Sequence, residues 1–168
     1  DEFLNLARTM DNKGIVYEFE TYKKLIKLGF TYEKDGYECN MGSLEYDMDT
    51  VFHSIEAYIN PREENVTLSV EVYNPYYGTV SDKCNMENKY SAMLEIIEEL
   101  FVDKFKKRPN IESSNSYGGS DDESITFSYN IKMNENNIMK FINTVKYVND
   151  TLINEMPNSG YAGENVLK

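Results

Sequence analysis

The fold is decided by residues 51–73, which read VFHSIEAYINPREENVTLSVEVY. Apolar side chains take every second position in both halves of this stretch: Ile55, Ala57, Ile59, Val66, Leu68, Val70 and Val72. Alternation with a period of two is typical of strands that bury one face. The polar residues from Asn60 to Asn65 separate the two halves, so the stretch predicts a β-hairpin with a solvated loop.

The opposite face of this hairpin carries polar and aromatic side chains: Glu56, Tyr58, Thr67, Ser69, Glu71 and Tyr73. Such residues can face water or a partner, but they do not pack spontaneously against an apolar layer. One face therefore belongs to the core. The use of the other face is the functional question.

Length and charge limit the class of protein. A chain of 168 residues buries about 68–70% of its surface on folding, which suffices to stabilise one domain without disulfides or metal ions. Lys and Arg number 17 against 29 Asp and Glu, a formal charge of −12. This field repels nucleic-acid phosphates and anionic membranes and attracts basic protein surfaces. It predicts no direct nucleic-acid or membrane binding, although acidity can also serve solubility alone.

Cysteine and histidine are too sparse to form a recognisable cofactor motif. Cys39, Cys84 and His53 are the only residues of these two types, and their spacing matches no zinc motif. We therefore expect free thiols, a cytoplasmic location and no cofactor. The abundance of Asn, Lys, Glu, Ile and Tyr favours an AT-rich coding sequence, as in a low-GC bacterium or its phage.

Helical and strand patterns alternate before the central hairpin. Residues 3–10 show a short amphipathic pattern, and residues 16–28 show a clearer one that ends at Gly29, a typical C′ residue. The segments 30–33 and 37–40 flank a Gly-containing turn and predict a second hairpin. Alternation at Leu44, Tyr46 and Met48 predicts a further short strand.

Two long helical patterns follow the central hairpin. From Asn88 to Lys107 apolar residues recur at helical spacing, with Asn88 as the expected N-cap and Pro109 as the stop. Residues 110–123 are polar and predict a loop with at most a short edge pairing. After a strand with one apolar face at Ile125–Ile131, Asn134 is the expected cap of the last helix, whose stripe is Ile138, Phe141, Ile142, Val145, Val148, Leu152 and Met156.

These elements predict a single α+β domain over residues 1–168, with 157–168 as a tail. We expect an antiparallel meander sheet of about five to six strands. Two long amphipathic helices, with one or two shorter N-terminal helices, would pack on it.

Candidate catalytic groups are scattered. Asp47 and Asp49 form a D-x-D pair that could share a divalent cation, and Asp121, Asp122 and Glu123 could offer oxygens to calcium without the ligand spacing of an EF-hand loop. His53 falls on the apolar side of its strand, which favours a structural role. No phosphate-cradling loop, G-x-S-x-G or H-E-x-x-H motif is present. We expect a protein that is not an enzyme.

Tyrosine is the unusual component of the composition, with fourteen residues and no Trp. Tyrosine offers a large, rigid contact area with a polar tip and is enriched at protein interfaces. It also has high strand propensity, so half-buried sheet positions are the alternative explanation. The candidate partner-binding residues are Glu56, Tyr58, Glu71, Tyr73, Tyr76 and Tyr77.

Charge and tyrosines together predict a non-enzymatic binding protein that occludes a basic surface of a protein partner, such as a nuclease. In charge and size the chain resembles nuclease immunity proteins and phage anti-CRISPR inhibitors. Its element order is similar to that of small secretion chaperones and YbjN-type domains, which implies an adaptor, often dimeric, as the alternative. A metal-dependent enzyme of unknown class is the second alternative. A monomeric inhibitor and a homodimer are both compatible with the sequence.

Overall fold

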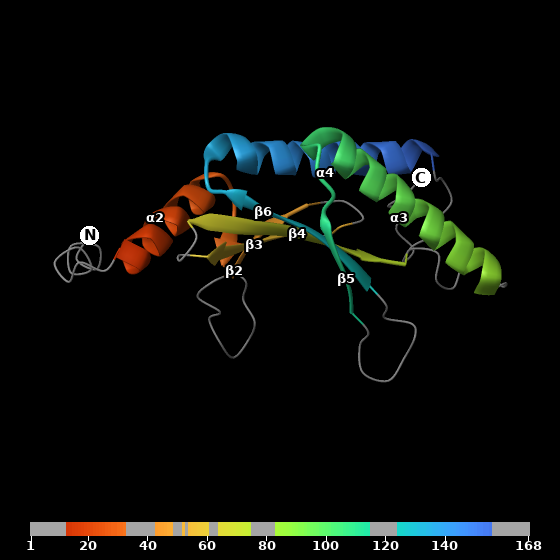
Figure 1. Cartoon of the computed structure of the whole chain (residues 1–168), viewed down its shortest axis with the longest axis horizontal. Coiled ribbons are helices and arrows are strands. Elements are labelled where there is room, and N and C mark those ends of the chain that lie inside the picture. Colours follow the sequence, from red (N-terminus) through yellow and green to blue (C-terminus); the bar gives the residue numbers. More distant parts are fainter. Residues whose placement is uncertain are drawn as a thin grey trace.

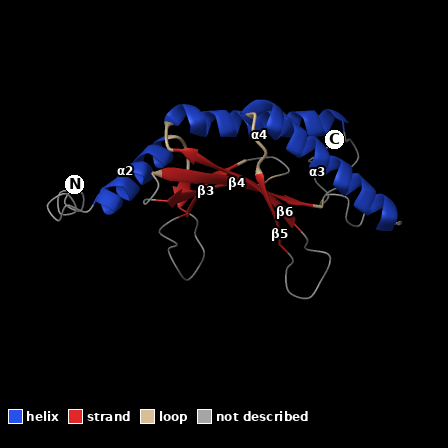
Figure 2. Cartoon of the chain, in the orientation of Figure 1, coloured by secondary structure: helices blue, strands red, loops and turns tan. Residues whose placement is uncertain are grey.

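The computed structural model describes residues 13–32, 43–48, 52, 54–60, 64–74, 83–114 and 124–155. These residues form one antiparallel sheet with three helices on the same side of it (Figures 1 and 2). The α+β class is thus as predicted. The expected helix within residues 3–10, the strand at 37–40 and the tail at 157–168 lie outside the described residues.

The sheet has the strand order β1-β2-β3-β4-β6-β5. Its strands are β1 (Thr31–Tyr32), β2 (Ser43–Asp47), β3 (Ser54–Asn60), β4 (Asn65–Tyr73), β5 (Asn110–Ser114) and β6 (Ser124–Lys132). Strand β1 pairs with β2, and the predicted hairpin partner of β1 at 37–40 lies outside the described residues.

The central hairpin has the predicted parity. Ile55 lies opposite Val70, Ala57 opposite Leu68 and Ile59 opposite Val66, and all six side chains are buried. The pairing of Asn60 with Asn65 extends the ladder to the ends of both strands, so the connection itself is shorter than expected.

The last two strands depart from the predicted meander. Strand β6 pairs with β4 on one side and with β5 on the other, so β5 lies beyond β6. The reason is polarity: β6 has apolar residues on one face and gains by a central position, whereas the five residues of β5 are mainly polar and suit an edge. Residues 110–114, where the sequence allowed a short edge pairing within a polar loop, form this edge strand.

Helix α2 (Lys13–Lys27) ends in a Schellman motif at the predicted glycine. The Gly29 amide donates to Ile26 O at 3.0 Å, and the Phe30 amide donates to Leu25 O at 3.0 Å. Gly29 has φ +112°, and a Cβ there would lie 3.0 Å from Cε2 of Tyr46. Backbone conformation and the neighbouring ring both require glycine at this position.

Helix α3 (Lys83–Phe105) begins earlier than predicted, so Asn88 lies inside the helix and does not cap it. Apolar residues recur at helical spacing only from Tyr90 onward. This spacing shows where one face of a helix becomes buried, and not where the helix begins. Helix α4 (Glu135–Glu155) has its predicted cap, since the Asn137 amide donates to Asn134 Oδ1 at 2.8 Å.

The core lies between the sheet and the helix layer. Around Phe101 of α3, four aromatic rings have centroids within 6.4 Å of the Phe101 centroid: Phe105, Phe127, Tyr129 and Phe141. The Tyr129 hydroxyl donates to Lys107 O at 2.7 Å, and the Tyr90 hydroxyl donates to Val72 O at 2.6 Å. These contacts join α3 and α4 to β4 and β6. The described helices all lie on this side of the sheet, so the opposite face of the sheet points away from them (Figure 1).

Candidate functional site

The sheet surface that faces away from the helices, here called the outer face, carries four of the six predicted site residues. Glu56 and Tyr58 lie on β3, and Glu71 and Tyr73 lie on β4. Across the hairpin, Glu56 lies opposite Ser69 and Tyr58 opposite Thr67. Tyr58 is 55% exposed and Tyr73 is 37% exposed, although β4 is otherwise buried or half-buried. Tyr76 and Tyr77 lie outside the described residues.

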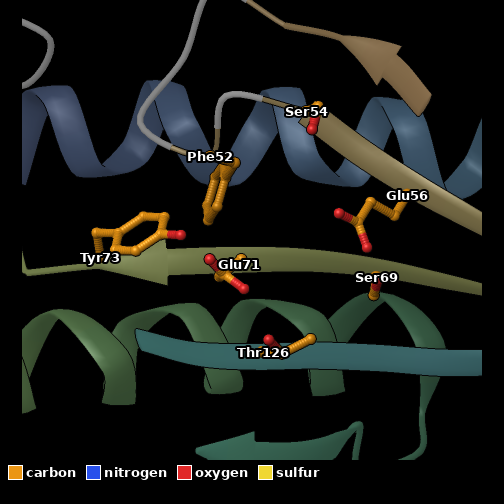
Figure 3. A pocket seen from close by; sticks show the side chains of 7 residues that line it. All are labelled: Phe52, Ser54, Glu56, Ser69, Glu71, Tyr73 and Thr126. Atoms are coloured by element: carbon orange, nitrogen blue, oxygen red, sulfur yellow. The ribbon is translucent and has the colours of Figure 1, made fainter. Parts of the chain in front are cut away.

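A hollow of about 300 Å³ opens on this face beside the hairpin (Figure 3). Its described lining comes from three strands and the turn before β3: Phe52, Ser54, Glu56, Ser69, Glu71, Tyr73 and Thr126. In Figure 3 the Glu56 side chain extends from β3 toward β4, and the Tyr73 hydroxyl points toward the side of the hollow where Phe52 and Glu71 lie. The hollow therefore gathers acidic, hydroxyl and aromatic groups.

The outer face concentrates negative charge. Register places five carboxylate residues at outer positions of the described strands: Glu45, Asp47, Glu56, Glu71 and Glu112. Glu45 lies directly opposite Glu56, where Cβ atoms are typically about 5 Å apart. Among the outer positions of β2 to β6, the only basic residue is Lys132, opposite Asn65 at the far end of β4. A cation approaching this face meets attraction from several strands together.

Strand pairing supplies lining residues that the sequence analysis did not select. Thr126 reaches the hollow because β6 pairs with β4 and places it opposite Glu71. Nothing local in the sequence indicates this contact. Phe52 could have been found, because it continues the even-numbered alternation of Ser54 and Glu56 onto the outer face. It is nonetheless only 2% exposed.

The structure adds little support for a functional role of the other candidate residues. Asp47 ends β2 with an exposed side chain, whereas its D-x-D partner Asp49 lies outside the described residues, as do His53, Cys39 and the cluster 121–123. Within the described part of the chain, no group of three or more His, Cys, Asp or Glu side chains is arranged to hold a metal ion. None of the described helices combines the length and apolarity needed to cross a bilayer.

Comparison with known proteins finds no matching family model, no curated protein with significant sequence similarity and no solved structure with a significant match.

Proposed function

We propose that this chain is a non-enzymatic binding protein whose outer face covers a basic surface of a protein partner. The observation that carries the proposal is the position of Tyr58 with Glu56 on β3 and of Tyr73 with Glu71 on β4, on the sheet face away from the helices. Tyrosines provide rigid contact area, and carboxylates complement Lys and Arg of a partner.

The partner class follows from charge. A net charge of −12 accelerates association with a basic protein and opposes association with nucleic acid itself. Proteins that bind nucleic acid expose basic surfaces of this kind. The function supported best is thus inhibition of a nucleic-acid-binding enzyme, such as a nuclease, by covering its basic surface. Nuclease immunity proteins and anti-CRISPR inhibitors act in this general manner.

Affinity capture from lysate of the source organism tests the proposal. The immobilised wild-type chain is compared with Glu56→Gln/Glu71→Gln and with Glu95→Gln/Glu99→Gln, a control on an exposed surface of α3 that changes the net charge equally. We expect one basic nucleic-acid-binding protein that is retained at low salt, weakened at high salt, and lost only from the outer-face variant.

Two results would contradict this function. Equal losses from both variants would mean that overall charge, and not the outer face, holds the partner. Recovery of a secretion substrate by a homodimeric chain would instead support the adaptor function.

A further inference from the structure

Strand β5 forms one border of the sheet. Within the described part of the chain it pairs only with β6, and the side chains of Asn110, Ile111, Glu112 and Ser113 are all exposed. In an antiparallel pair, alternate residues direct their N–H and C=O groups away from the neighbouring strand. Strand β5 therefore presents a row of backbone donors and acceptors, which is a template for a further strand. The strand at the opposite border, β1, has only two residues and offers less.

The inner side of this edge ends in an exposed apolar side chain. Strand register places Ile111 opposite Phe127, and Phe127 opposite Val70 in the core. Phe127 is 2% exposed, whereas Ile111 is 37% exposed although both belong to the same cross-strand row. An apolar side chain on an added strand would cover Ile111 and continue this row.

The outer side of the same edge is acidic. Glu112 lies opposite Thr126, which lies opposite Glu71, so this row of outer-face positions ends with a carboxylate at the edge. The Asn110 side-chain amide donates to Glu112 Oε1 at 3.2 Å. Because this donor is neutral, Glu112 keeps its negative charge. A lysine or arginine at the facing position of an added strand would complement that charge.

Charge also decides which chain supplies the strand. A second copy of this chain would bring a further net charge of −12, so repulsion opposes an edge-to-edge dimer. A basic partner is attracted by the same field. The occupant that fits the edge is therefore an extended segment in which apolar and basic residues alternate.

We infer that the edge of β5 takes up one extended segment of the basic partner as a further strand of the sheet, with an apolar side chain beside Ile111 and a lysine or arginine beside Glu112. This inference rests on the proposed function and names the way in which the partner is held. Main-chain hydrogen bonds supply affinity in strand addition, and alternate side chains supply specificity.

A titration with short blocked peptides tests strand addition. The ¹⁵N-labelled chain receives a peptide of alternating lysine and valine, a peptide of alternating glutamate and valine, or the lysine–valine peptide methylated at every backbone nitrogen. We expect the lysine–valine peptide to give saturable amide shifts at Ile111 and Glu112. At saturation it should slow hydrogen exchange of alternate β5 amides at least about tenfold. The other two peptides should bind at least about tenfold more weakly, because one is repelled and the other lacks backbone donors.

Variants locate the binding. Glu112→Gln should weaken the lysine–valine peptide about threefold, whereas Glu95→Gln, on an exposed surface of α3, changes the net charge equally and should have no effect. Ile111→Thr keeps strand propensity but removes the apolar contact, so it should also weaken the peptide. Val102→Thr, at an equally exposed position of α3, should not. Absence of saturable shifts, unchanged exchange in β5, equal binding of the methylated peptide, or equal weakening by the α3 variants would overturn strand addition.

Strand addition and the proposed function can fail separately. If Glu56→Gln/Glu71→Gln loses the captured partner but the lysine–valine peptide does not protect β5, the function stands and strand addition is wrong. If the peptide protects β5 but both capture variants retain the partner equally, the edge binds basic strands and the outer face is not the interface.

Discussion

The two faces of the central strands have opposite chemistry although their residues alternate along the same chain. On the inner face, Ile55, Leu68 and Val70 are at most 1% exposed. On the outer face the neighbouring positions carry Glu, Ser, Thr and Tyr, and among the described outer positions of β3, β4 and β6 no aliphatic side chain occurs. The fold depends on the inner face, so the composition of the outer face is available for binding.

Two aromatic rings on the helix side of the molecule lie beside lysine side chains. On the helix layer, Nζ of Lys104 lies 4.7 Å from the Tyr147 ring centroid, and Nζ of Lys140 lies 4.7 Å from that of Phe105. Tyr147 and Phe105 thus each have a lysine of the same chain over the ring. On the outer face, Tyr58 follows Glu56 on β3 and Tyr73 follows Glu71 on β4.

The largest expected effect comes from placing a charge on the inner face. Val70→Asp should reduce the free energy of unfolding by about 4 kcal/mol or more, because it buries an unpaired carboxylate, and the chain should unfold or aggregate. Thr67→Asp on the outer face should cost only about 1 kcal/mol through strand propensity. Circular dichroism melts of both variants measure this contrast, and normal melting of Val70→Asp would refute the assigned parity.

Removing the central aromatic ring should have the next largest effect. Phe101→Ala should cost about 3–5 kcal/mol, because Phe101 is fully buried and four other rings surround it. Tyr147→Ala removes a ring that is 47% exposed on α4 and should cost far less. Urea denaturation of the two variants gives both values, and a similar loss for both would mean that the helix layer is not packed as described.

The N-cap of α4, a helix that covers the inner face, should contribute a moderate amount to the free energy of unfolding. Asn134→Ala should reduce the free energy of unfolding by about 1 kcal/mol, because the Asn137 amide loses its acceptor. Asn143→Ala is the control at an exposed position within the same helix and should be neutral or slightly stabilising. Chemical denaturation distinguishes them, and equal effects would argue against the cap.

The Tyr129 hydroxyl should produce the smallest change near neutral pH. Tyr129→Phe should cost about 1 kcal/mol or less through loss of the hydrogen bond to Lys107 O. Burial, with a smaller effect of the Glu98 charge, raises the pKa of Tyr129 to about 12. Its ordinary pKa is about 10, so this stability is complete below about pH 10 and is lost as pH rises toward 12.

Stability of both proteins as a function of pH tests that sign. Wild type should lose stability more steeply than Tyr129→Phe between about pH 10 and 12. Parallel curves would show that Tyr129 has the same pKa in the folded and unfolded chain.

Local sequence patterns predicted which residues form helices and strands better than they predicted which strands pair with one another. Gly29 and Asn134 were found from the sequence because helix ends have short-range chemical signals, and the parity of β3 and β4 follows from alternation alone. The position of β6 between β4 and β5 depends on pairing across a whole helix, which no local signal encodes.

The residues of the candidate site also differ in whether local sequence patterns or long-range strand pairing would identify them. The outer-face positions of Glu56 and Glu71 followed from parity. The contribution of Thr126 required the long-range pairing of β4 with β6, and the hollow required side-chain packing around Phe52. A sequence could therefore indicate which face is polar but not where that face is hollowed.

The most direct measurement compares folding and partner capture in one variant, Glu56→Lys/Tyr58→Ala/Glu71→Lys/Tyr73→Ala. If the outer face binds and the inner face folds, this variant should melt cooperatively with the α+β circular dichroism spectrum of the wild type and should no longer capture the basic partner. A folded variant that captures the partner as well as the wild type would contradict the account, because the binding surface would then lie elsewhere on the molecule.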